Sequence, residues 1–294
     1  MFKNLFPLVF KNRRNRVGLT LIGLLCLYFF SCDTGSEQKI QLLKLKRKVS
    51  LVAHRGAADV APENTLAAIR KALESPADFI EVDIHQTKDG ELILMHDASV
   101  NRTTNGKGAI ADLTLAQIKE LDAGIWFDST FQKEKVPTLE EVLKLVKGKK
   151  KLLIEIKKAE DSFYPGIESK TLEMIRQQRA QDWCVIQSFY DEVLENIWKN
   201  EYAVATHKLI IGKIPFIPLY FDHRFHWGEF DKYDRATAIN PHQYFATRSF
   251  VKHLHARGFK TFVWTVDNPK AINHLLAIGV EGVLTNNISK LVVE

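Results

Sequence analysis

The stretch FIEVDIH, residues 79–85, decides the fold. Alternate side chains of a strand share a face, so Glu81 and Asp83 point the same way as His85. Val82 and Ile84 point the other way and suit packing against helices. Carboxylates on the inner face of a closed sheet are costly unless they are paired with cations or bind a metal. The stretch therefore predicts a barrel strand that carries a polar site.

Short apolar runs recur along the chain, and most are separated by amphipathic segments of helical period. The runs are 51–53, 79–83, 152–156, 185–186, 209–211, 236–239, 261–265 and 282–284. Alternation of strand and helix is typical of a parallel sheet. Eight strands within about 250 residues favour a TIM-type (β/α)₈ barrel, spanning residues 49–294. An open doubly wound sheet is the alternative, although no G-x-G-x-x-G motif follows any run.

The alternation is interrupted once, after the second run. Residues 87–90, TKDG, form a turn signal, and residues 91–95 then suit a strand that returns as a hairpin. Residues 98–138 follow as an insertion with a short helix near 115–121. We expect this insertion to pack over one mouth of the barrel.

The N-terminal residues 1–31 have the features of an export signal. Five basic residues precede the apolar run 17–30, and FFSC at 29–32 resembles a bacterial lipobox, although Leu is preferred where Phe29 stands. A lipobox predicts cleavage before Cys32, lipid modification of that cysteine, and an exported protein on the periplasmic or cell-surface side of a membrane. An uncleaved N-terminal membrane anchor is the alternative. Residues 32–48 are predicted to form a polar tether.

The basic character of the chain belongs to this N-terminal segment. Residues 1–31 hold five of the 41 lysines and arginines and none of the 35 acidic residues, which leaves a formal charge of +1 for the remainder. The charge therefore gives no evidence for nucleic-acid binding. Of three cysteines, only Cys184 falls in the barrel, so a disulfide framework is excluded there. The oligomeric state is not predictable.

A second strand, LLIEIK at 152–157, repeats the pattern of inward charge with Glu155 and Lys157. Three inward carboxylates, Glu81, Asp83 and Glu155, predict a site for a hard cation such as Mg²⁺ or Ca²⁺, because oxygen ligands suit these ions. The alternative is an ion-pair network with Arg55 and Lys157.

The first strand ends at HRG, residues 54–56, and the hairpin ends at His96. His54 and Arg55 can reach one site only where the strand stops, and Gly56 makes the necessary bend cheap. Two histidines at strand ends suit a general acid and a general base, and this is the end of the barrel at which active sites lie. In PENT, residues 62–65, Glu63 and Asn64 are candidates for capping the first helix.

Several motifs in order resemble the glycerophosphodiester phosphodiesterase family. They are HRGAADVAPENT (54–65), EVDIHQTKDG (81–90), MHDASVNRTTNGKG (95–108), LLIEIK (152–157), IQSF (186–189) and VWTVD (263–267). The family has a (β/α)₈ barrel and hydrolyses glycerophosphodiesters to glycerol 3-phosphate and an alcohol with a divalent cation. The likeness covers most of residues 50–286.

The resemblance implies a role for each matching residue. His54 and His96 become the acid–base pair. The resemblance leaves open which of them is the acid, and our own working assignment is His54 as base and His96 as acid. Glu81, Asp83 and Glu155 become metal ligands, and Glu63 braces the site. Four residues become contacts for the phosphate or the glycerol: Arg55, Lys157, Phe189 and Trp264. The alternatives are a phosphodiesterase acting on lysophospholipids or sphingomyelin, and a lipoprotein that binds phosphodiesters without turnover.

Two departures from the family pattern concern the rim. Asn286 follows Thr285 where the family usually has aspartate, and we expect this change to alter a rim contact rather than the chemistry. The segment 214–227 is unusually apolar and aromatic for a loop after a barrel strand. We expect Phe216 and Tyr220 either to pack against a helix or to form a hydrophobic wall for an acyl chain or a membrane surface.

Overall fold

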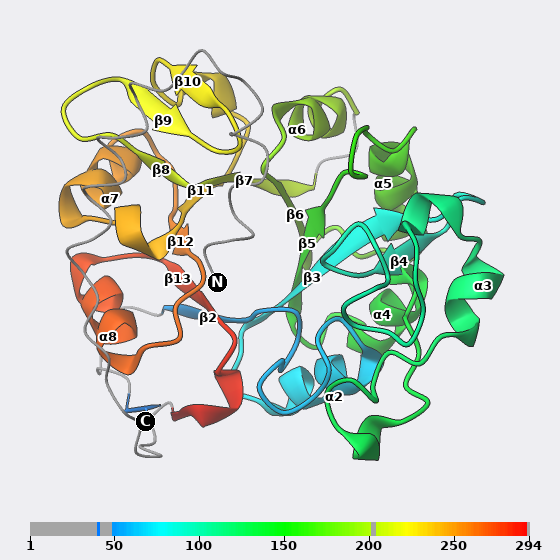
Figure 1. The fold of residues 1–294 in the computed structure, drawn as a ribbon. Helices are drawn as coiled ribbons and strands as arrows, with labels where there is room; N and C mark the ends of the chain where they lie inside the picture. Colours follow the sequence, from blue (N-terminus) through cyan, green and yellow to red (C-terminus); the bar gives the residue numbers. More distant parts are fainter. Residues whose placement is uncertain (1–39, 42–48, 201–203, 293–294) are drawn as a thin grey trace, which may run out of the picture. The chain divides into compact units, whose positions relative to one another are not determined.

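The structure, a computed structural model, describes residues 40–41, 49–200 and 204–292. Eight parallel strands surround a common axis, and the chain is seen nearly along that axis in Figure 1. The strands are β2 (Ser50–Ala53), β3 (Phe79–Gln86), β5 (Lys151–Ile156), β6 (Cys184–Ser188), β7 (Ala205–Ile210), β11 (Ala238–Pro241), β12 (Phe262–Val263) and β13 (Gly282–Thr285). Each coincides with or overlaps one of the eight predicted runs.

The sheet closes into a barrel. Its strand order is β11-β7-β6-β5-β3-β2-β13-β12, and parallel bridges Ala238–Lys260 and His242–Trp264 join the two ends. The predicted TIM-type barrel is confirmed, and the open sheet is wrong.

Alternation along the strands creates two apolar layers. Val82, Ile84 and Ile154 belong to the large outer cluster between sheet and helices. Phe79 and Leu153 belong to a smaller cluster inside the barrel, where Phe79 meets Phe262 edge to face at 5.6 Å. The interior is therefore a packed apolar plug beneath the charged residues of the upper strand ends.

The helices begin where polar side chains cap them. Thr65 accepts a hydrogen bond from the Ala68 amide at the start of the first helix, and Thr138 forms a capping box with Glu141. The cap of the first helix is thus Thr65, and the prediction of Glu63 or Asn64 is wrong. The helices outside the insertion are α2 (Leu66–Glu74), α4 (Leu139–Val146), α5 (Ile167–Gln177), α6 (Asp191–Trp198), α7 (Arg248–His255) and α8 (Pro269–Ile278).

The predicted hairpin is present: β4 (Leu92–Leu94) pairs antiparallel with β3. The insertion after it contains α3 (Leu115–Glu120) and the one-turn helices η3 (Ile110–Asp112) and η4 (Ser129–Phe131). Its apolar side chains, including Ile110 and Ile118, form a separate cluster with Ile93 and Met95. The insertion therefore packs on the hairpin, and Ala67 at the start of α2 donates to its Glu134 (3.1 Å).

One repeat of the barrel has a sheet in place of its helix. Between β7 and β11 lie β8 (Gly212–Lys213), β9 (Leu219–Phe221) and β10 (Phe225–Trp227), which form an antiparallel sheet, and the single turn η5 (Asp231–Tyr233). After β11 the chain makes the turn η6 (Gln243–Phe245) before α7. After β13 it makes the turn η7 (Ile288–Lys290) and the short strand β14 (Leu291–Val292), which pairs with β1 (Ile40–Gln41).

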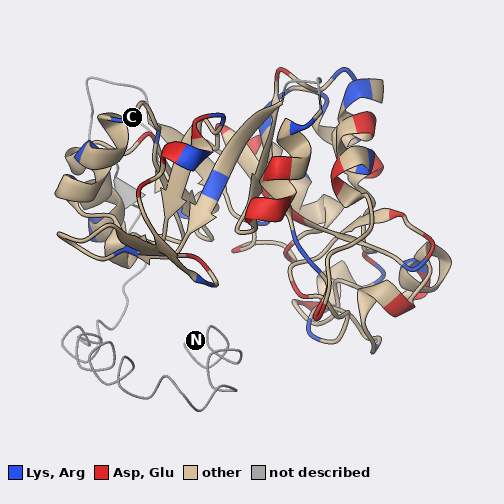
Figure 2. Cartoon of the chain, turned by 90° about the horizontal axis from the view of Figure 1, so that it is seen from above, with Lys and Arg blue, Asp and Glu red and all other residues tan. Residues whose placement is uncertain are grey.

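Charges of both signs are interspersed over the helices and the insertion (Figure 2). Among the described residues, no helix is both long enough and apolar enough to cross a bilayer. The predicted signal 1–31, Cys32 and most of the tether lie outside the described residues.

Candidate active site

Three buried carboxylates gather at the C-terminal ends of β3 and β5. Asp83 pairs in register with Glu155, and Glu81 lies two residues earlier on the same face of β3. Carboxylate oxygens of the three residues all lie within 4.8 Å of one another. Burial and the neighbouring carboxylates raise the pKa of Glu81 well above its usual range. Burial also raises the pKa of Glu155, against the opposing effect of Lys157.

Two cations meet this cluster. The Lys157 Nζ lies 2.9 Å from Asp83 Oδ1 and 2.5 Å from Glu155 Oε1, and the Arg55 Nε lies 3.6 Å from Asp83 Oδ2. Burial alone would raise the pKa of Asp83, but Lys157 and its other positively charged neighbours hold it below its usual range. Part of the alternative ion-pair network is therefore present.

The donor set fits a hard cation nonetheless. All three carboxylates are buried, and together they face two cationic side chains, Arg55 and Lys157. Oxygen ligands at this spacing, with more carboxylates than cationic side chains, suit Mg²⁺ or Ca²⁺.

The chain leaves β2 through a left-handed bend. Arg55 has φ 57° and Gly56 has φ 82°, and the Arg55 amide donates to Glu81 Oε2 at 2.8 Å. A Cβ at Gly56 would lie 2.8 Å from the Ala68 Cβ, so glycine is required for space as well as for φ. This bend brings His54 and Arg55 to the same site, as their position at a strand end predicts.

His54 is held from its far side by a neutral amide. Its Nδ1 lies 2.6 Å from Asn286 Oδ1, and its Nε2 lies 3.9 Å from Glu81 Oε2. Burial, followed by the charge of Arg55, lowers the pKa of His54 to about 4. The imidazole is therefore unprotonated at neutral pH.

The orientation of Asn286 follows from Asp267. Asn286 donates from Nδ2 to Asp267 Oδ2 (2.7 Å) and from its backbone amide to Asp267 Oδ1 (2.7 Å). A carboxylate accepts only, so the amide oxygen faces His54 and Nδ1 of that ring carries the hydrogen. The rim contact that Asn286 makes is thus with the candidate catalytic ring of His54, and the expectation that the change leaves the chemistry unaltered stays a prediction.

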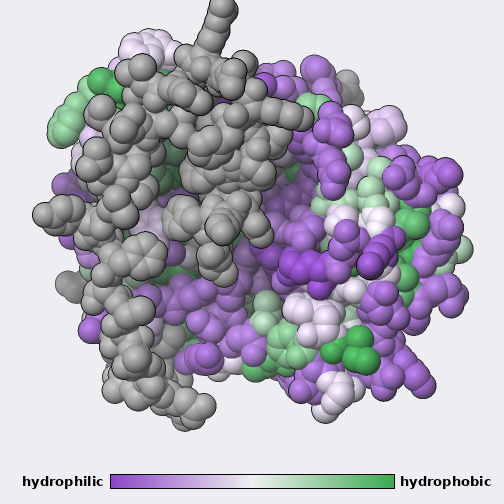
Figure 3. Space-filling view, in the orientation of Figure 1, coloured by the Kyte–Doolittle hydropathy of each residue, from purple (hydrophilic) through white to green (hydrophobic). Residues whose placement is uncertain are grey.

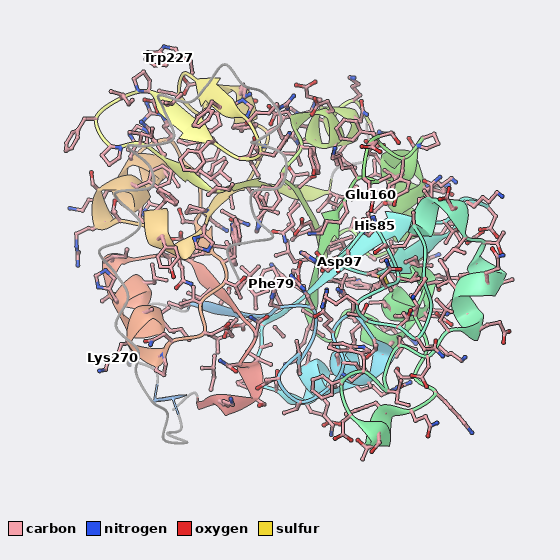
Figure 4. The ribbon with its side chains drawn as sticks, in the orientation of Figure 1. Phe79, His85, Asp97, Glu160, Trp227 and Lys270 are labelled. Atoms are coloured by element: carbon pink, nitrogen blue, oxygen red, sulfur yellow. The ribbon has the colours of Figure 1, made fainter. Side chains whose placement is uncertain are left out.

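His96 is held by a carboxylate instead. Its Nδ1 lies 2.8 Å from Asp97 Oδ1, and its backbone oxygen lies 3.3 Å from His85 Nε2. His85 in turn lies 2.9 Å from the Tyr164 hydroxyl, and Figure 4 shows His85 and Asp97 near each other beside the barrel centre. Burial and the charge of Lys157 lower the pKa of His96.

Glu63 connects Arg55 with the residues around His96. It accepts from Arg55 Nη1 (2.8 Å) and from Arg102 Nη2 (2.7 Å), while Arg102 Nε donates to Asp97 Oδ2 (2.7 Å). A chain of ion pairs thus runs from Arg55 to the carboxylate that holds His96. The structure places Glu63 where it can brace both groups.

An aromatic wall closes the other side of the barrel mouth. Phe189 and Trp264 meet edge to face with ring centroids 5.3 Å apart, and Trp264 Nε1 donates to the Asn240 oxygen (2.9 Å). The ring of His242 packs against that of Trp264, with ring centroids 4.9 Å apart.

Three polar residues at the site were missed in the sequence. Asn64, at φ 56°, donates to Asp83 Oδ2 (2.8 Å) and accepts from the Asp83 amide (3.1 Å). Arg102 and Asp267 act through the contacts described above. All three lie within quoted motifs: Asn64 in PENT, Arg102 in 95–108 and Asp267 at the end of VWTVD. Only the tertiary fold shows what their side chains contact.

Comparison with known proteins agrees with this geometry. The model of the glycerophosphoryl diester phosphodiesterase family matches residues 54–290. The chain belongs to this family. The family is one of phosphoric diester hydrolases.

Named relatives span nearly the whole domain. A glycerophosphodiester phosphodiesterase of Caldanaerobacter subterraneus subsp. tengcongensis is 35% identical over 246 residues, which cover 83% of this chain and 97% of the relative. A glycerophosphodiester phosphodiesterase of Bacillus subtilis is 34% identical over 289 residues, covering 93% and 96%.

A solved structure is similar throughout the barrel. It is a phosphodiesterase of Oleispira antarctica in complex with the product sn-glycerol-3-phosphate, with a TM-score of 0.72 and 28% identity. The match covers 82% of this chain and 94% of the other.

Proposed function

We propose that this protein hydrolyses glycerophosphodiesters to glycerol 3-phosphate and an alcohol, with a divalent cation and two histidines. The observation that carries the proposal is the meeting of His54, His96 and three buried carboxylates at one barrel mouth. Membership of the family supports it, as does the product bound to the similar Oleispira phosphodiesterase. A protein that only binds phosphodiesters needs no acid–base pair.

Glu81, Asp83 and Glu155 would hold the cation, which is Mg²⁺ or Ca²⁺. When bound, it polarises a phosphoryl oxygen and neutralises developing negative charge. Arg55 and Lys157 add fixed positive charge beside the same position, where a phosphodiester gains negative charge in its transition state.

The partners of the two histidines support different roles. His54 carries hydrogen on Nδ1 and a lone pair on Nε2, so it can accept the proton of the attacking hydroxyl, whether from water or from the glycerol moiety. His96 lies on the Asp97 carboxylate, which stabilises the protonated ring. His96 therefore suits the acid that returns a proton to the leaving alkoxide.

Release of glycerol 3-phosphate from glycerophosphocholine tests the proposal directly. We expect turnover that EDTA abolishes and that Mg²⁺ or Ca²⁺ restores. Glu74→Gln, which removes a carboxylate that pairs with Lys71 on the surface of α2, should leave this turnover unchanged. No release with either cation supplied would overturn the proposal, and full turnover in EDTA would overturn the role of the carboxylates.

We further propose that residues 1–31 direct export and that the protein is attached to a membrane through a lipid on Cys32 or through the uncleaved segment. The basic and apolar pattern of these residues supports this proposal. Expression of wild-type and Cys32→Ser chains followed by membrane fractionation and mass determination distinguishes the two routes. Recovery of both chains uncut and free of membranes would contradict it.

A further inference from the structure

The sheet β8-β9-β10 has two different faces. Pairing places Tyr220 opposite His226, and their rings stack at 4.8 Å with an interplanar angle of 6°. Tyr220 is buried with Phe230 and Tyr233 in a cluster against β11 and α7. This inner face does the packing that a helix does elsewhere, so the expectation that Tyr220 forms an acyl-chain wall is wrong.

The outer face is apolar as well. The register places Phe225 opposite Phe221 and Trp227 opposite Leu219, so these four side chains share the face away from the barrel. Phe225 is 63% exposed and Trp227 is 76% exposed. A strand in a sheet covered on one side normally alternates apolar residues facing the core with polar residues facing water. Here the residues facing water are apolar too.

The turn between β8 and β9 extends this surface. Phe216 has φ 66° and is fully exposed, and Ile217 beside it is 39% exposed. Trp227 stands at the outer edge of the molecule in Figure 4, and apolar side chains of this region lie at the upper left edge in Figure 3. We define the aromatic face as Phe216, Ile217, Leu219, Phe221, Phe225 and Trp227.

Buried ion pairs hold the aromatic face rigidly on the barrel. Lys208 of β7 is fully buried and lies 2.8 Å from both Asp222, just after β9, and Asp191 of α6. His226 of β10 lies 3.0 Å from the same Asp222. Removing one partner of such a network is costly, so the sheet is a fixed platform for its exposed rings.

The composition of the aromatic face favours a lipid surface as its occupant. Its six members carry no charge, and tryptophan with phenylalanine is the combination that enters the interface between water and hydrocarbon. The same chain begins with an apolar run, 17–30, that is itself suited to a membrane. We propose that the aromatic face docks the catalytic domain on the surface of a lipid bilayer.

Aromatic contacts continue from this face toward the active site. Phe221 meets Phe245 edge to face at 5.1 Å, and the neighbouring Tyr244 packs on His242 at 4.9 Å. His242 meets Trp264, the partner of Phe189 in the aromatic wall. Resting on the proposed function, docking at this face favours substrates whose glycerol carries an acyl chain, namely lysophospholipids held at the bilayer.

Tryptophan fluorescence of the full-length chain tests docking separately from the N-terminal segment, because the difference between the wild type and Trp227→Phe isolates Trp227 among the five tryptophans. The protein is reconstituted with phosphatidylcholine vesicles whose acyl chains carry bromine, a short-range quencher. We expect quenching in the wild type that Trp227→Phe removes. Phe216→Ser with Phe225→Ser should also reduce Trp227 quenching, while Ile125→Ser, an equally apolar change at a 46% exposed site of the insertion, should not.

Turnover provides the second measurement. The Phe216→Ser, Phe225→Ser double variant should lose roughly tenfold in kcat/KM on lysophosphatidylcholine in vesicles, because apolar area is lost at the interface. Its kcat/KM on soluble glycerophosphocholine should be unchanged, which also shows that it is folded. Equal losses on both substrates would overturn the preference for acyl substrates.

Identical quenching in the wild type and Trp227→Phe would overturn docking, whatever the activity. If the face instead joins two copies of the chain, these substitutions would lower the sedimenting mass in detergent without affecting lipid quenching, and that result would also overturn the proposal. Failure of the proposed function has a different signature: Trp227 is quenched, but glycerophosphocholine is not hydrolysed.

Discussion

The rims of β2 and of the hairpin each present a histidine to the same carboxylates, but through different partners. His54 is supported by a neutral amide, Asn286, whereas His96 is supported by a carboxylate, Asp97, which Arg102 also binds. A neutral acceptor fixes the orientation of a ring and favours its protonated form less than a carboxylate does, because it carries no charge. A carboxylate fixes the orientation and also stabilises the proton. Two identical side chains can thus be given opposite tasks by their supports.

Removal of either histidine is the strongest test of this comparison. We expect His54→Ala and His96→Ala each to lower kcat on glycerophosphocholine by about 10²- to 10⁴-fold. With a glycerophosphodiester of nitrophenol, whose leaving group needs no proton, His96→Ala should recover most of its activity and His54→Ala should not. The reverse pattern would exchange the two roles, and equal recovery would refute the division of tasks.

Changing the support of His54 should have a smaller, more diagnostic effect. Asn286→Ala removes the acceptor at Nδ1 and should lower kcat by about tenfold with little change in KM, since a hydrogen bond of this kind contributes about 1 kcal/mol. Asn286→Asp keeps the acceptor but adds charge, which raises the pKa of His54. The acidic limb of its kcat/KM profile should therefore move to higher pH.

The pH dependence of kcat/KM distinguishes an effect of Asn286 on His54 from an effect on the stability of the fold. A purely structural role for Asn286 would reduce activity in both variants and leave the position of the acidic limb unchanged. Such a result would show that the amide does not act through His54.

The smallest effect on catalysis is expected at His207, a buried histidine that contacts neither Asn286 nor Asp97. Its Nδ1 lies 3.1 Å from Asn240 Nδ2, and burial lowers its pKa to about 3. Both folded and unfolded chains hold it neutral above pH 6.5. Below that value His207 takes up a proton in the unfolded chain but not in the folded chain. The free energy of unfolding therefore falls, by at most about 1.4 kcal/mol per pH unit.

Urea unfolding between pH 7 and pH 4 measures this contribution. His207→Gln should flatten the decline of unfolding free energy with falling pH, while His274→Gln, at an exposed position of α8, should leave it unchanged. An unchanged slope in His207→Gln would show that this ring does not contribute to acid lability.

Much of the barrel was predictable because its strands are short apolar runs with period-two charge at their ends. The strands, the hairpin and the cluster of Glu81, Asp83 and Glu155 all follow from that local pattern. The sequence also indicates why His54 and Arg55 share a site, since Gly56 permits the bend.

What could not be predicted depends on contacts between distant segments. Asn286 reaches His54 across 232 positions, and nothing near either residue encodes that contact. The aromatic segment 214–227 carries too few residues per strand for its period to separate sheet from helix. Only packing shows that Tyr220 faces inward while Phe216 faces outward.

The sheet that stands between β7 and β11 has a consequence for protein engineering. Barrel closure depends on the register of the eight strands, and this unit keeps its register although its outer layer is of a different kind. Segment 211–237 is bounded by β7 and β11 and supplies the layer that covers them, including the Asp222 partner of buried Lys208. A designed helical hairpin that retains an anion opposite Lys208 could replace it. The active site would be kept, and the surface that carries the aromatic face would be removed.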